Sequence, residues 1–174
     1  MAKVSFTKLA LKVNQDVKNI DFNGIDIEVK QYLPINTKLE IISNVINASA
    51  DENNFANPVK ISIFTTLEIM YNYTNINFTD KQKEDPTKLY DMMMSSGLVA
   101  VVVNAIPEAE YQEIINGVAD SIDAIYTYRN SAVGLLERVT EDYSALNLDA
   151  STIHSKLADP ENMTLLKDIL TKLG

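Results

Sequence analysis

The sequence predicts an α+β fold that is mostly α, in which an N-terminal β-hairpin or three-stranded antiparallel sheet packs on a helical bundle. Two observations lead to this prediction. An Asn23-Gly24 dipeptide separates two short stretches of alternating apolar and polar residues, and beyond about residue 35 the apolar residues recur at helical spacing. At 174 residues the chain suits a single domain, 1–174, with a β element over 1–34 and a helical body over 35–174.

The hairpin is predicted by its turn. A two-residue loop requires positive φ at both central positions, which Asn and Gly tolerate. Strands over 17–22 and 25–32 then form one apolar face, which another element must cover. The cross-strand pairs on this face are Phe22 with Ile25 and Ile20 with Ile27.

A further strand is expected before the hairpin, because a two-stranded ribbon alone is marginal in water. Residues 2–13 carry apolar side chains at close to every second position. They are Val4, Phe6, Leu9, Leu11 and Val13.

Helix starts in the body are indicated by capping residues. Thr37-x-x-Glu40 has the form of a capping box. Three Asn-Pro or Asp-Pro pairs place a good N-cap before proline at the first helical position: Asn57-Pro58, Asp85-Pro86 and Asp159-Pro160. The predicted helices cover about 37–49, 58–73, 86–96 (closed by Gly97), 98–105, 108–143, 151–157 and 160–173. The long helix could bend or break at Gly117 or at the Asn130-Ser131 step.

Composition excludes several functions. The chain has no cysteine, which rules out disulfides, thiolate metal sites and cysteine nucleophiles. The net charge is −9, and the excess of acid lies after residue 50, so nucleic-acid binding is disfavoured. No apolar stretch is long enough to span a bilayer and the N-terminus lacks a signal-peptide pattern, so we expect a cytoplasmic protein that does not bind membranes.

No residue pattern predicts catalysis. The only histidine, His154, has Asp149 and Asp159 five residues away on either side, which is not the spacing of neighbours on one helix face. The acidic groups Glu110 with Glu113, and Glu137 with Glu141 and Asp142, are interpreted as the solvated face of the long helix. We therefore expect a protein that is not an enzyme, with no catalytic, metal-binding or cofactor-binding residue and no cofactor.

Three apolar segments are candidates for binding a protein partner. The methionines could instead fill the core, and the terminal helix could pack on the body. The candidate residues are Phe22, Asn23, Gly24 and Ile25 at the hairpin tip, Met92, Met93 and Met94, and Leu166, Ile169, Leu170 and Leu173 of the terminal helix.

Three segments resemble small virion-morphogenesis proteins of phages and prophages of low-GC Gram-positive bacteria. They are Val4-Ser5-Phe6-Thr7-Lys8-Leu9, the stretch from Phe22-Asn23-Gly24 through Val29-Lys30-Gln31-Tyr32-Leu33-Pro34, and Phe78-Thr79-Asp80-Lys81-Gln82-Lys83-Glu84-Asp85-Pro86. The layout is similar to that of tail assembly chaperones of long-tailed phages.

This resemblance implies a non-enzymatic protein in the cytoplasm of the host bacterium. Such a protein binds tape-measure or tail-tube proteins during virion assembly and self-associates. Two alternatives stay open: a structural virion component, such as a connector or tail completion protein, and a phage-encoded regulator that binds a host protein.

Overall fold

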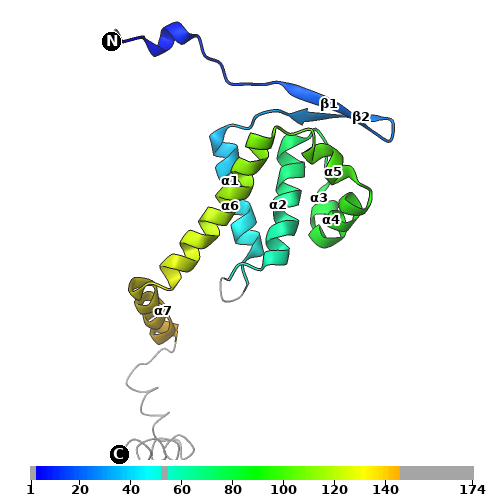
Figure 1. The fold of residues 1–174 in the computed structure, drawn as a ribbon. Coiled ribbons are helices and arrows are strands. Elements are labelled where there is room, and N and C mark those ends of the chain that lie inside the picture. Colours follow the sequence, from blue (N-terminus) through cyan, green and yellow to red (C-terminus); the bar gives the residue numbers. More distant parts are fainter. Residues whose placement is uncertain (1–2, 52–54, 146–174) are drawn as a thin grey trace, which may run out of the picture. The chain divides into compact units, whose positions relative to one another are not determined.

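The computed structural model describes residues 3–51 and 55–145 and divides the chain into two compact units, Met1–Ala124 and Ile125–Gly174 (Figure 1). The predicted α+β fold, mostly α, is confirmed, with a hairpin rather than a three-stranded sheet. The elements of the first unit are a 3-10 helix Phe6–Leu9, β1 Val17–Phe22, β2 Ile25–Lys30, α1 Ile35–Ser49, α2 Pro58–Tyr73, α3 Asp80–Lys83, α4 Pro86–Ser95 and α5 Leu98–Val103. Helix α6, Glu108–Arg129, begins in the first unit and ends in the second, which also contains α7, Ala132–Ala145.

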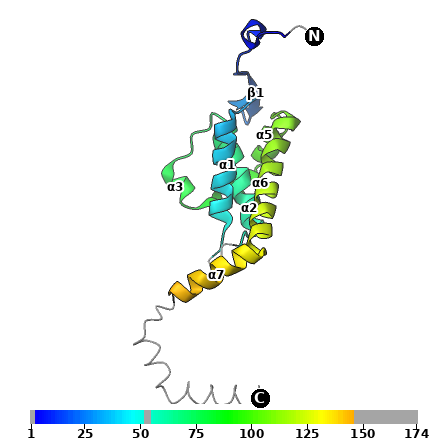
Figure 2. The same ribbon diagram turned by 90° about the vertical axis from the view of Figure 1, so that its left-hand side faces the viewer.

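The hairpin has the predicted turn and register. Asn23 and Gly24 both adopt positive φ, 56° and 79°, and β1 pairs antiparallel with β2 so that Phe22 faces Ile25 and Ile20 faces Ile27. Both views show the hairpin at one end of α1 and α2 (Figures 1 and 2).

The outer edge of β2 is attached to the end of α2. Val29 pairs with Thr74, Asn75 N–H donates to the Glu28 carbonyl at 3.2 Å, and Glu28 N–H donates to Asn75 Oδ1 at 3.1 Å. The hairpin is therefore fixed to the helices by backbone pairing as well as by its apolar face.

The predicted strand over 2–13 is wrong. Its described residues contain the 3-10 helix, Ala10 adopts a left-handed φ of 47°, and none of residues 3–13 is buried. The physical reason lies in the spacing. The apolar residues occupy even positions up to Phe6 and odd positions from Leu9, so a strand through them has no continuous apolar face.

Two of the three predicted proline-led helix starts are confirmed. Helix α2 covers the predicted 58–73, with Asn57 Oδ1 accepting from Val59 N–H at 2.9 Å, and Asp85 Oδ1 accepts from Lys88 N–H at 3.0 Å at the start of α4. Gly97 follows α4 at φ 79°, as a C-terminal glycine should. The third pair, Asp159-Pro160, lies outside the described residues, as do the predicted helices over 151–157 and 160–173.

Two other helix boundaries differ from the prediction. Helix α1 begins at Ile35, two residues before the predicted start, so Thr37 lies inside the first turn and is not the N-cap. Among the described residues, the capping box is formed by Thr79 and Gln82 at the start of α3. The predicted helix over 108–143 breaks at Asn130-Ser131, where the Ser131 hydroxyl accepts from Gly134 N–H at 3.2 Å and starts α7.

The core of the first unit takes side chains from the hairpin and from most of its helices. Val29 of β2, Val45 of α1, Met70 of α2, Val102 of α5 and Ile114 of α6 are completely buried in it. Gly117 lets α6 approach α1 closely, because a Cβ there would lie 2.5 Å from Ile42 Cδ1. Among the helices that the structure describes, none is long and apolar enough to cross a membrane.

Replacing Gly24 by Val should lower the free energy of unfolding by about 1–2 kcal/mol, since a β-branched residue resists the left-handed conformation. No other atom lies within 4 Å of a Cβ built at Gly24, so the cost comes from the backbone conformation and not from a clash. Urea unfolding followed by circular dichroism measures it. Gly24→Asn, which tolerates positive φ, is the control; equal stability of the two variants would contradict the role given to this turn.

Candidate functional site

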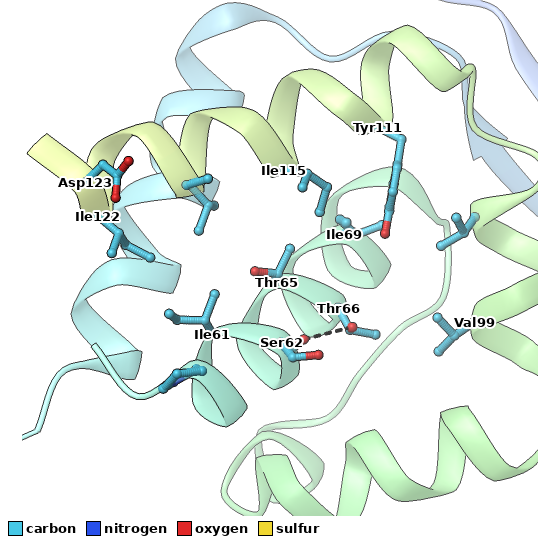
Figure 3. A pocket seen from close by; sticks show the side chains of 14 residues that line it. Ile61, Ser62, Thr65, Thr66, Ile69, Val99, Tyr111, Ile115, Ile122 and Asp123 are labelled. Atoms are coloured by element: carbon cyan, nitrogen blue, oxygen red, sulfur yellow. Dashed lines mark hydrogen bonds between the residues drawn. The ribbon is translucent and has the colours of Figure 1, made fainter. Parts of the chain in front are cut away.

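A groove of about 450 Å³ opens between α2, α5 and α6 of the first unit (Figure 3). Its lining is mostly aliphatic, and Figure 3 shows Tyr111 and Ile115 projecting from α6 towards α2. The lining residues are Pro58, Ile61, Ser62, Thr65, Thr66 and Ile69 of α2, Val99 and Val103 of α5, and Tyr111, Ile115, Val118, Ala119, Ile122 and Asp123 of α6.

Helical periodicity explains why these residues line one groove. On α2 they recur at intervals of three and four from Pro58 to Ile69, and on α6 at similar intervals from Tyr111 to Asp123, so each helix contributes one continuous stripe. Residues beside these stripes, such as Met70 and Ile114, complete the core. Each helix thus contributes one stripe in which a buried core residue, Ile69 on α2 and Val118 on α6, lies beside half-buried residues that also line the groove.

The groove contains one polar group without a partner. The Thr65 side-chain oxygen is buried and forms no hydrogen bond within the described chain. By contrast, Thr66 Oγ1 donates to the Ser62 carbonyl at 2.9 Å. A buried hydroxyl without a partner is costly, and this one lies beneath the surface of the groove, out of reach of solvent.

An ion-pair network ties α6 to α1 beside this groove. Lys38 of α1, only 3% exposed, places Nζ 2.9 Å from Glu110 Oε1 and 2.6 Å from Glu113 Oε2, both on α6. The same ammonium group lies 4.8 Å from the centre of the Tyr32 ring.

Glu110 is the centre of this network. Besides the Lys38 contact, its Oε2 accepts from the backbone N–H of Leu33 at 3.1 Å and from the Tyr73 hydroxyl at 3.3 Å. One carboxylate therefore joins the segment before α1, the end of α2 and the first turn of α6.

Burial and charge act on the pKa values of this network. Burial lowers the pKa of Lys38, but the hydrogen bonds and charges of Glu113 and Glu110 outweigh it, so this pKa lies above its ordinary value of 10.5. Burial, together with the neighbouring Glu110 carboxylate, raises the pKa of Tyr73 well above 10.0. At neutral pH Lys38 is charged and Tyr73 is neutral, so the network has no proton to exchange there.

The candidate partner-binding residues predicted from sequence lie elsewhere. At the hairpin tip Phe22 is half-buried, whereas Asn23, Gly24 and Ile25 are exposed. Met93 is a core residue, while Met92 and Met94 are exposed beside a shallow hollow that Asp85 and Lys88 also line. None of these residues lines the groove. Leu166, Ile169, Leu170 and Leu173 lie outside the described residues, and so does His154.

Two parts of this site were missed from sequence. The solvated face predicted for Glu110 is wrong, because its side chain is only 13% exposed and binds Lys38. Glu113 is exposed as predicted, but it also binds Lys38. The groove stripe on α2, from Pro58 to Ile69, has no counterpart among the predicted binding residues. A signal for Lys38 did exist, since it lies three residues before Ile41 and seven before Val45 on the buried face of α1.

Metal binding finds no support within the described ranges, where no three His, Cys, Asp or Glu side chains are grouped so that they could hold a metal ion. What the groove can do chemically is bind: it offers apolar contact area, the hydroxyl-bearing residues Ser62, Thr66 and Tyr111, and one carboxylate, Asp123.

Replacing Lys38 by Met should lower the free energy of unfolding by about 3 kcal/mol, because it leaves the buried Glu110 carboxylate without its counter-charge. Lys18→Met, at an exposed position of β1, is the matched control and should change little. The two glutamates can be compared in the same way. Glu110→Gln should lower the free energy of unfolding more than Glu113→Gln does, because the Glu113 side chain is 51% exposed. Urea titrations measure all four; equal losses for Lys38→Met and Lys18→Met would contradict the role of the network.

Stability should also fall at alkaline pH. The raised pKa of Lys38 means that its contribution is complete below pH 10.5 and is lost as the pH rises through the higher native value. Tyr73 acts in the same direction, because above about pH 10 the unfolded chain ionises this phenol more readily than the folded chain does. The free energy of unfolding of Tyr73→Phe should therefore fall less steeply than that of the unmodified protein between about pH 9 and pH 11, where each limit holds to about one pH unit. Urea unfolding at each pH measures it, and parallel curves for the two proteins would contradict the assignment.

Comparison of the chain with protein-family models, curated proteins and solved structures found no match. The similarity of its three segments to phage morphogenesis proteins therefore stays a prediction. The functional proposal below depends on the groove geometry together with that resemblance.

Proposed function

We propose that this protein binds an apolar segment of another protein in the groove between α2, α5 and α6, and that it acts as a tail assembly chaperone-like factor during virion assembly. The single observation that carries the proposal is the groove itself. Its lining joins apolar stripes of α2 and α6, in which the buried Ile69 and Val118 lie beside half-buried residues such as Ile61 and Ile122.

The size and shape of the groove suit a helical or extended peptide. A volume of about 450 Å³ accommodates a few anchoring side chains, as in complexes where an amphipathic helix places its apolar face in a groove. The Lys38 network supports this use, because it fixes the first turns of α6 to α1 and so keeps that wall in place without a ligand.

Charge limits the kind of client. Between residues 108 and 124, α6 carries five acidic and no basic residues, and Asp123 lines the groove. A client segment with an apolar face flanked by lysine or arginine is favoured, and a net charge of −9 helps to keep a complex with an apolar client in solution.

The resemblance to tail assembly chaperones supplies the client class, namely tape-measure or tail-tube proteins. A long, apolar, helical tape-measure protein needs its exposed apolar surface covered until tail-tube subunits surround it. Binding of this kind requires no cofactor and takes place in the cytoplasm of the host bacterium.

Ser62→Tyr tests this function, because Ser62 is an exposed lining residue and a tyrosine there obstructs the groove without changing the core. Val59→Tyr is the matched control: it adds the same side chain to the same helix at an exposed position outside the groove. Each variant is co-expressed with the tape-measure protein encoded in the same genome, and the soluble fraction of that client is measured.

We expect the Ser62→Tyr variant to lose at least half of the client solubility that the Val59→Tyr variant maintains. Equal client solubility with both folded variants would reject the groove as the client site. Mass spectrometry of purified virions tests the structural alternative, because a structural component is present at stoichiometric copy number and a chaperone is absent.

A further inference from the structure

We propose that, before a client arrives, the groove of each chain holds the N-terminal arm, residues 3–13, of a second copy of the chain. This inference rests on the proposed use of the groove as a peptide-binding site. It names the first ligand of that site as a segment of the same sequence.

The arm is apolar and exposed along its described length. Its five large apolar side chains are each more than half exposed, with Phe6 at 76% and Leu11 at 67%. The backbone hydrogen bonds of this segment are local, from Lys8 N–H to the Ser5 carbonyl and from Ala10 N–H to the Thr7 carbonyl. So many exposed apolar side chains in so short a segment indicate a surface that another element covers.

The hairpin of its own chain is not that element. The alternation of apolar and polar residues in the arm breaks between Phe6 and Leu9, so the arm cannot add a strand with one apolar face. In addition, Asn75 already pairs with the outer edge of β2. The base of the arm is held in place, because the Asp16 carbonyl accepts from Gln31 N–H at 2.9 Å. An exposed segment on a fixed base is suited to exchange between two copies, which is a low-cost route to a dimer.

Charge complementarity selects the groove as the receiving surface. Residues 3–13 carry three lysines, Lys3, Lys8 and Lys12, and no acidic residue. The α6 wall has the opposite composition: Glu110 and Glu113 are paired with Lys38, and the exposed Asp120 and Asp123 add two further carboxylates, of which Asp123 lines the groove. An apolar segment with interspersed lysines is the type of ligand that this groove favours.

Two copies that each insert an arm into the other form a closed, isologous dimer. In that dimer the arm shields the groove, and a client must displace it to bind.

The absence of cysteine from the sequence allows a direct test. One preparation of the full chain carries Leu9→Cys in the arm, a second carries Ser62→Cys at the groove, and the two are mixed and treated with a short bismaleimide. We expect a cross-linked heterodimer. Leu39→Cys, at an exposed position of α1 outside the groove, replaces Ser62→Cys in the control and should give at least fivefold less product.

Analytical ultracentrifugation provides the second measurement. The unmodified chain should be dimeric, and Phe6→Asp should raise the dimer dissociation constant at least tenfold, whereas Leu39→Asp should leave it unchanged. A monomeric unmodified chain would overturn the proposal, and so would a chain with both Leu9→Cys and Ser62→Cys that cross-links only within itself. A dimer that persists in Phe6→Asp would overturn it as well.

The two proposals fail in different ways. If the arm cross-links to the groove of a second copy but Ser62→Tyr still keeps the tape-measure protein soluble, the inference holds and the proposed function is wrong. If Ser62→Tyr loses the client but no heterodimer forms, the proposed function holds and the arm is not the resident ligand.

Discussion

The arrangement of the first unit depends on one buried charge. Lys38 on α1 binds Glu110 and Glu113 on α6, and Glu110 also accepts from Leu33 and Tyr73. Taking a lysine out of water is unfavourable unless carboxylates surround it, so α1 and α6 can pack in only the register that brings these groups together. That register sets the stripe of α6 beside the stripe of α2, and the groove lies where their half-buried residues, such as Ile61 and Ile122, adjoin the core.

The groove and the arm have complementary properties. One is a concave, mostly aliphatic surface with a carboxylate at its edge and an unpaired hydroxyl inside; the other is an exposed, apolar and basic segment. A protein that binds apolar clients faces the difficulty that its own empty site promotes aggregation. A weakly bound segment of a second copy resolves that difficulty, because it covers the site and can still be displaced.

The accuracy of the sequence predictions follows the distance over which each interaction acts. The Asn23-Gly24 turn, the start of α2 at Asn57-Pro58 and the start of α4 at Asp85-Pro86 all depend on neighbours within about four residues, and all three are confirmed. The strand predicted over 2–13 is wrong because its apolar positions change parity between Phe6 and Leu9. Gly117 and Asn130-Ser131 are both possible break points of the long helix, and the structure places the break at the second.

By itself, the sequence determined the class of the fold, the hairpin and its register, and most helix starts in the described chain, since turn and capping chemistry is local. Only the tertiary structure decided the candidate site. Lys38 and Glu110 are 72 residues apart in sequence, and the groove unites stripes from α2 and α6. A sequence shows that a helix face is apolar, but whether that face enters the core or lines a groove depends on how closely the facing helix approaches, which packing and the buried Lys38 charge decide together.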